Sequence, residues 1–203
     1  MKVTVIDYDA GNLRSVETAL TYLGLEYVVS SKPEDCLKAE KILFPGVGEA
    51  KAAMGVLQKQ GLDSALKEAF KKGTPILGIC LGSQIVMDYS QEGNAECLGL
   101  IPGKAVKFPE IPGCKVPHMG WNTVEPVVST PLFSDIPHDT SFYFVHSYYP
   151  KPENSSFILC ETEYGIKFAS GIKNENCTAF QFHPEKSGVF GLKLLYSFIA
   201  GKE

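Results

Sequence analysis

The chain has 203 residues, with 44% hydrophobic residues, 21% charged residues and a formal net charge of -4 at pH 7. This size and composition fit one compact domain over residues 1–203 that buries a core without disulfides or metals. The acidic balance argues against a nucleic-acid partner, and the absence of any run of about 18 apolar residues argues against a membrane span.

The first half alternates short β-rich runs with amphipathic helices. Strands are predicted at 2–6, 26–30, 41–44 and 76–79, and helices at 12–23, from residue 33, at 50–58 and at 62–72. This alternation is typical of an α/β fold with a parallel sheet.

From about residue 98, short β-runs follow one another. They are predicted at 105–108, 141–145, 157–160, 167–172 and 178–182, before a last helix at 187–200. We therefore expect a three-layer α/β fold. Its central sheet is mostly parallel and flanked by helices, and an antiparallel β extension in the C-terminal half packs on the first half.

The cysteines and the N-terminus indicate the compartment. The six cysteines form no Cys-x-x-Cys pair, which predicts reduced thiols rather than a disulfide scaffold or a metal site. The apolar run within the first seven residues is too short for a signal peptide, and a charged residue ends it at Asp7. We expect a cytoplasmic protein without metal or cofactor.

Cys80 has the setting of a nucleophile. It follows an apolar strand, precedes an apolar helix, and lies between Gly78 and Gly82. This spacing is typical of a nucleophile elbow, whose tight turn requires small flanking residues. The N-terminus of a helix also favours a thiolate. A buried structural cysteine fits the same residues about as well.

His183 and Glu185 are candidates for a base and the carboxylate that orients it. His183 is predicted at the end of a strand, and in an extended stretch Glu185 points to the same side. A nucleophile, a base and an orienting carboxylate form the general triad. Taken alone, the pair also fits a surface histidine beside an exposed glutamate.

The segment that follows the strand at 41–44 is a candidate oxyanion hole. Backbone N–H groups of Gly46 and Val47, with that of Leu81 after the nucleophile, could stabilise an oxyanion. The alternative is an ordinary turn. A phosphate-binding loop is excluded because no Gly-Lys-Ser/Thr follows.

Three segments in this order resemble class I glutamine amidotransferases: PGVG at 45–48, GICLGSQ at 78–84 and FHPE at 182–185. Further stretches are similar to the glutaminase subunit of imidazole glycerol phosphate synthase, namely YDAGN at 8–12, PHMGWN at 117–122, YFVHSY at 143–148 and KS at 186–187. Ser83 departs from this family, which more often has Met there, and it is expected to adjoin the glutamine pocket.

The resemblance implies that Cys80 attacks the side-chain amide of L-glutamine, that His183 transfers the protons, and that water hydrolyses the glutamyl thioester. It also implies that the substrate is held by Gly48, Gln84 and main chain near Ser147 and Tyr148.

The resemblance further implies that ammonia passes to a cyclase subunit. That subunit makes imidazole glycerol phosphate and aminoimidazole carboxamide ribotide in histidine biosynthesis. Since no cyclase-sized segment follows the last helix, we expect the partner to bind in trans as a heterodimer. Interface candidates are Asn12, Trp121, Tyr143, His146 and Lys186. Core packing of the two larger aromatic side chains and a solvated lysine are the alternatives.

Three other functions fit parts of the sequence. An amidotransferase subunit for anthranilate or pyridoxal phosphate synthesis is disfavoured by the PHMGWN segment. A non-catalytic binding module is disfavoured because Cys80 and His183 are both present. A cysteine hydrolase of related fold usually has its histidine soon after the cysteine, whereas here the two are far apart in the chain.

Overall fold

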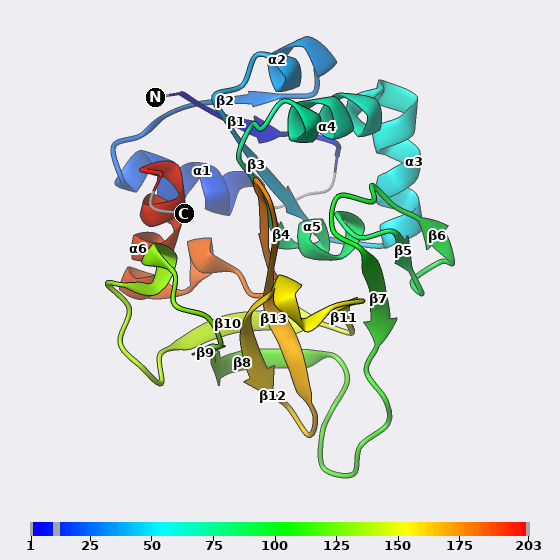
Figure 1. Ribbon diagram of the computed structural model, residues 1–203, viewed down its shortest axis with the longest axis vertical. Coiled ribbons are helices and arrows are strands. Elements are labelled where there is room, and N and C mark those ends of the chain that lie inside the picture. Colours follow the sequence, from blue (N-terminus) through cyan, green and yellow to red (C-terminus); the bar gives the residue numbers. More distant parts are fainter. Residues whose placement is uncertain (1, 10–12, 202–203) are drawn as a thin grey trace.

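The computed structural model describes residues 2–9 and 13–201, and its centre is an eight-stranded sheet (Figure 1). The strand order is β2-β1-β3-β4-β14-β13-β12-β9, parallel from β2 to β14 and antiparallel beyond. These strands are β1 (Lys2–Ile6), β2 (Glu26–Ser30), β3 (Lys41–Gly46), β4 (Ile76–Cys80), β9 (Glu125–Pro126), β12 (Ile158–Glu163), β13 (Lys167–Asn174) and β14 (Cys177–Phe180).

Helices cover both faces of this sheet. One face packs on α1 (Leu13–Tyr22) and α6 (Gly188–Ile199), and the other on α2 (Pro33–Leu37), α3 (Ala50–Gln60), α4 (Leu62–Lys71) and α5 (Leu81–Ile85). Each helix turns an apolar stripe toward the strands, so two hydrophobic clusters form, one on each face. The predicted three-layer α/β fold is confirmed.

The antiparallel part is arranged differently from the prediction. β13, β12 and β9 form the predicted antiparallel extension, but they lengthen the central sheet at its edge instead of packing on the first half. Short turns join β12 to β13 and β13 to β14, so these strands pair side by side. Two smaller sheets complete the fold. One joins β10 (Ser141–His146) to β8 (His118–Thr123), and the other has the order β11 (Tyr148–Pro152), β7 (Gly103–Lys107), β5 (Tyr89–Ser90) and β6 (Ala95–Glu96).

Several predicted boundaries were wrong near the site. β3 runs on to Gly46, and β14 stops at Phe180, two residues earlier than predicted. β8 and β11 were not predicted, since prolines and mixed polar residues obscure their alternation. Residues 2–9 and 13–201 also include three short 3-10 helices: η1 (Pro131–Phe133), η2 (Ser155–Phe157) and η3 (Pro184–Lys186).

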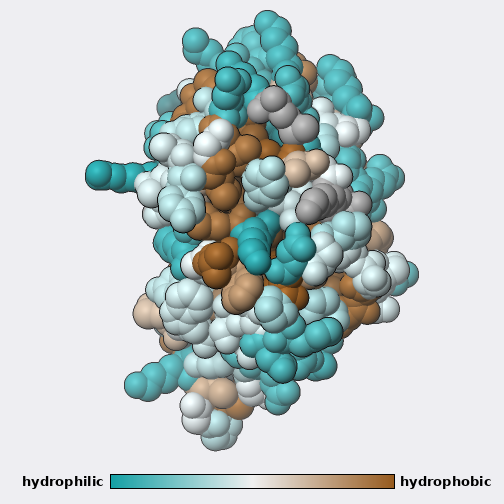
Figure 2. Space-filling view, turned by 90° about the vertical axis from the view of Figure 1, so that its left-hand side faces the viewer, coloured by the Kyte–Doolittle hydropathy of each residue, from teal (hydrophilic) through white to brown (hydrophobic). Residues whose placement is uncertain are grey.

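The surface on the side of α1 and α6 mixes hydrophobic and hydrophilic residues (Figure 2). Exposed apolar side chains here include Tyr22, Val189 and Tyr196. Within residues 2–9 and 13–201, every helix is too short or too polar to traverse a bilayer.

Candidate active site

Cys80 occupies a strained turn between β4 and α5. Its φ of 55° and ψ of -109° lie outside the regions that L-residues normally adopt. A Cβ at Gly82 would overlap the carbonyl oxygen of Phe44, and one at Gly78 would lie 3.0 Å from the backbone of Gly82. The predicted need for small residues on both sides of Cys80 therefore has a direct steric cause.

His183 and Glu185 form a buried pair. Nδ1 of His183 lies 2.8 Å from Oε1 of Glu185, and their side chains are 2% and 1% exposed. His183 lies three residues beyond β14, and the 3-10 helix η3 starts at the next residue. The prediction of an extended stretch was wrong here, because the 3-10 turn itself brings the carboxylate to the imidazole.

The backbone of His183 is held by hydrogen bonds on both sides of the residue. The backbone N–H of His183 donates to the carbonyl of Tyr143 at 2.9 Å. The hydroxyl of Ser187 donates to the carbonyl of His183 at 2.6 Å and accepts from the N–H of Tyr143 at 2.9 Å. These bonds fix the position of the ring relative to β10.

The free nitrogen of this ring faces the thiol. Nε2 of His183 is buried and has no hydrogen-bond partner among the described residues. Burial lowers the pKa of His183, but interactions with the Cys80 thiol and with Glu185 outweigh it and raise the pKa to about 9. The structure therefore brings together the sulfur and the imidazole that the sequence separates by about 100 residues, and Glu185 stabilises the imidazolium.

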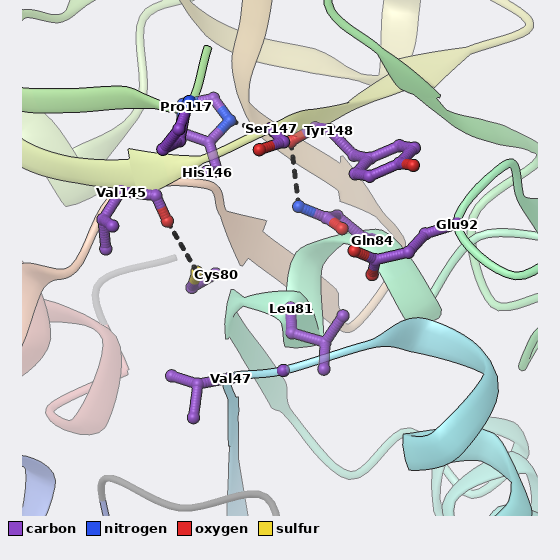
Figure 3. A pocket seen from close by; sticks show the side chains of 11 residues that line it. Val47, Cys80, Leu81, Gln84, Glu92, Pro117, Val145, His146, Ser147 and Tyr148 are labelled. Carbon is purple, nitrogen blue, oxygen red and sulfur yellow. Dashed lines mark hydrogen bonds between the residues drawn. The ribbon is translucent and has the colours of Figure 1, made fainter.

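A pocket of about 380 Å³ opens at the sulfur (Figure 3). Its lining includes seven residues that were predicted for catalysis, the oxyanion hole or substrate binding: Val47, Gly48, Cys80, Leu81, Gln84, Ser147 and Tyr148. Val47 and Leu81 lie on one side of Cys80 in Figure 3, and Val145 lies on the other. Gly46, the remaining predicted oxyanion residue, pairs with Cys80 in the register of β3 and β4.

Gln84 is fixed by two neighbours. Its Nε2 donates to the carbonyl of Tyr148 and to Oε1 of Gln181, both at 2.9 Å. Since both amide hydrogens are used, Oε1 is the atom that Gln84 can offer to a ligand as an acceptor.

Ser83 differs from the prediction. It is fully buried, and its hydroxyl donates to the carbonyl of Cys80 at 2.7 Å. It does not line the pocket. Ser83 therefore stabilises the turn that carries the sulfur, and its side chain lies outside the lining of the pocket.

Two residues at the site with polar side chains, Glu92 and Gln181, were not predicted from the sequence. Glu92 lines the pocket, where its carboxylate accepts from the N–H of Ala50 at 2.8 Å and burial raises its pKa. No local pattern pointed to it. Gln181 is fully buried, with Nε2 3.8 Å from the sulfur of Cys80. Its position two residues before His183 was the available signal.

The predicted interface residues do not all share one surface. Trp121 is 59% exposed on β8, and its ring meets that of Tyr143 edge-on at 6.2 Å. Lys186 is partly buried in η3. His146 is 5% exposed and bonds to the buried His118, and it lines the pocket at the sulfur instead of the outer surface. Asn12 is outside the described residues.

The fold and the site are those of a class-I glutamine amidotransferase. The model of that family, "Glutamine amidotransferase class-I", matches residues 4–200. PurLQS from Thermotoga maritima has a similar fold, with a TM-score of 0.73 and 19% identity over 98% of this chain and 97% of that one.

More similar relatives narrow the family. The imidazole glycerol phosphate synthase subunit HisH of Dehalococcoides mccartyi strain 195 is 46% identical over 97% of this chain and 95% of its own length. The subunit of the same name from Neisseria meningitidis serogroup B is 44% identical over 98% of this chain and 99% of its own length. The chain belongs to this HisH family of glutamine amidotransferases.

Proposed function

We propose that this chain hydrolyses L-glutamine to glutamate and ammonia and supplies the ammonia to the cyclase subunit of imidazole glycerol phosphate synthase. The reaction serves histidine biosynthesis in the cytoplasm. The observation that carries the proposal is the buried pair of His183 and Glu185 beside Cys80, at the base of a pocket open to a small molecule.

Acylation follows from this geometry. The sulfur of Cys80 attacks the side-chain carbonyl carbon of glutamine, and the thiol proton resides on His183. The oxyanion is stabilised by backbone N–H groups of Leu81 and of the Gly46–Val47 segment. When the C–N bond breaks, the imidazolium protonates the leaving nitrogen, so ammonia departs and a glutamyl thioester remains.

Deacylation reverses these roles. His183 accepts a proton from water, and the hydroxide adds to the thioester carbon. The C–S bond then breaks, glutamate leaves, and the proton returns to the sulfur. Gln84 and the main chain of Ser147 and Tyr148 line the pocket on the side away from Val47 (Figure 3), where they can hold the substrate through both steps.

Delivery to a partner in trans gives a role to the exposed apolar side chains of β8. Trp121 and Met119 on β8 are 59% and 62% exposed. Aromatic side chains are frequent at the centres of interfaces. We assign this surface, with Tyr143 and Lys186, to the cyclase in a heterodimer. Direct transfer is needed because free ammonia at neutral pH is mostly ammonium, which is not a nucleophile.

A glutaminase assay tests the proposal. Wild type, Cys80→Ala and Cys36→Ala are compared alone, with the cyclase, and with the cyclase and its ribotide substrate. Cys36 is a buried thiol in α2, distant from the pocket, and serves as the control.

We expect loss of glutamine hydrolysis in Cys80→Ala only, and stimulation of the wild type by the loaded cyclase. Turnover by Cys80→Ala close to that of wild type would exclude the mechanism. Hydrolysis that responds to another synthase, and not to the cyclase, would assign the chain to that synthase.

A further inference from the structure

Two uncharged groups contact the sulfur of Cys80 with opposite effects. The carbonyl oxygen of Val145 lies 3.9 Å away and Nε2 of Gln181 lies 3.8 Å away. A carbonyl oxygen only accepts hydrogen bonds, so it favours the protonated thiol. An amide N–H only donates, so it favours the thiolate.

The amide of Gln181 cannot turn its oxygen to the sulfur without losing a bond. Its Oε1 accepts from Nε2 of Gln84 at 2.9 Å, and its backbone N–H donates to the carbonyl of Ser170 at 2.9 Å. The residue is fully buried. Its N–H group is therefore directed at the sulfur in advance of any ligand.

The helix that follows Cys80 supplies little of this stabilisation. α5 spans only Leu81–Ile85, so few peptide dipoles align behind the sulfur. In the described part of the chain, the titratable groups that interact with the sulfur are His183, whose imidazole bonds to Glu185, and Tyr8. Glu92 and His146 line the same pocket. Burial raises the pKa of Tyr8, which keeps it neutral.

We propose that the side-chain amide of Gln181 stabilises the thiolate of Cys80, and that Gln84 orients this amide. The inference rests on the proposed function, because it takes Cys80 as the nucleophile. It also gives Gln84 a second role, since the same side chain lines the pocket and fixes the donor to the sulfur.

Alkylation of Cys80 by iodoacetamide, followed from pH 5 to pH 10 with the modified residue located by mass spectrometry, tests this role without a turnover assay. In Gln181→Met the donor is removed and the size of the side chain is kept. We expect the pH midpoint to rise and alkylation at pH 7 to slow about tenfold, the effect of one unit in a thiol pKa. The control is Thr178→Val, at a buried residue of β14 three positions before Gln181, and the hydroxyl of Thr178 has no partner in the described part of the chain.

An unchanged profile in Gln181→Met would overturn the proposal. If this variant fails to fold, Gln181→Glu carries the same test. It keeps the shape and an acceptor for Gln84, and its carboxylate must also slow alkylation at pH 7. Because the glutaminase assay of Cys80→Ala is independent of this profile, failure of the role of Gln181 is distinguishable from failure of the proposed function.

Discussion

Nδ1 of His118 donates a hydrogen bond to Nε2 of His146 across 3.0 Å in the interior of the protein. The donor and acceptor in this bond follow from the other ring nitrogen of His146. Nδ1 of His146 lies 2.8 Å from the carbonyl of Tyr148, which can only accept, so this nitrogen carries the proton. Nε2 of a neutral His146 must then accept from His118. The same carbonyl also accepts a hydrogen bond from Nε2 of Gln84. His146 and Gln84 therefore both fix Tyr148, which lines the pocket.

This pair predicts a loss of stability in acid. Burial lowers the pKa of His118 to about 4 and that of His146 to about 3. The unfolded chain binds protons more readily than the folded protein below pH 6.5, so the free energy of unfolding falls as the pH drops from about 6.5 to about 4. By pH 5 the loss from His118 alone is about 2 kcal/mol, because each pH unit below 6.5 contributes about 1.4 kcal/mol. Urea denaturation at pH 7 and at pH 5 measures it.

His118→Asn is the matched variant for this prediction. The asparagine amide can replace the Nδ1 donor but does not titrate. We expect lower stability at pH 7, because the ring stacking on Phe144 and Tyr164 is lost, and a smaller further loss at pH 5. An equal acid-induced loss in both proteins would contradict the assignment of the effect to His118.

Glu185→Gln isolates the charge of the orienting carboxylate. An amide oxygen can still accept from Nδ1 of His183, but it no longer stabilises the imidazolium. We expect kcat for glutamine hydrolysis to fall about 10²–10⁴-fold, with the KM for glutamine nearly unchanged. Steady-state kinetics measure both constants. A large rise in KM with kcat retained would place Glu185 in substrate binding instead.

The pH profile of the wild type gives a second measure of the same pair. His183 must carry a proton when ammonia leaves, and its pKa is raised to about 9. Glutamine hydrolysis should therefore persist through neutral pH and decline as the pH rises through about 9. In Glu185→Gln this decline should move to lower pH, because one of the interactions that raise the pKa is gone. If activity declines at the same pH in Glu185→Gln and in wild type, the decline does not report the titration of His183.

The sequence predicted the parts of the site that depend on local pattern. The strand, the strained turn and the glycines at Cys80 follow from chain geometry over a few residues. Gln181, Glu92 and the interior position of His146 depend on which strands become neighbours. In the structure, β13, β12 and β9 continue the central sheet, and β8 pairs with β10. The periodicity within a single strand does not encode which strand lies beside it.

The substitution Gly46→Ala tests the steric limits of the oxyanion segment. A Cβ at this position would overlap the hydroxyl of Tyr8 and lie 3.2 Å from the Cβ of Leu81. We expect Gly46→Ala to lower kcat and to cost about 1–3 kcal/mol of stability. Tyr8→Phe removes the overlapping oxygen and leaves the ring carbon at 3.2 Å. The double variant should therefore regain part of both losses, and kinetics with thermal unfolding measure them.

The hydroxyl of Tyr8 makes this a sharp comparison, because it is buried without a hydrogen-bond partner in the described part of the chain. Tyr8→Phe alone should cost little stability. If Gly46→Ala remains equally impaired in the Tyr8→Phe background, the steric account is wrong and the backbone conformation at Gly46 is the constraint.

Trp121 tests the surface assigned to the cyclase. The side chain is 59% exposed and contacts Tyr143 only at its edge, so Trp121→Ala should leave the free energy of unfolding of the isolated subunit nearly unchanged. A central interface tryptophan contributes about 2 kcal/mol or more, which corresponds to a roughly 30-fold weaker Kd for the cyclase by calorimetry. Val189→Ala, which removes a side chain 62% exposed on α6, is the control and should retain wild-type affinity. If Trp121→Ala binds the cyclase as tightly as Val189→Ala and wild type do, β8 is not part of the interface.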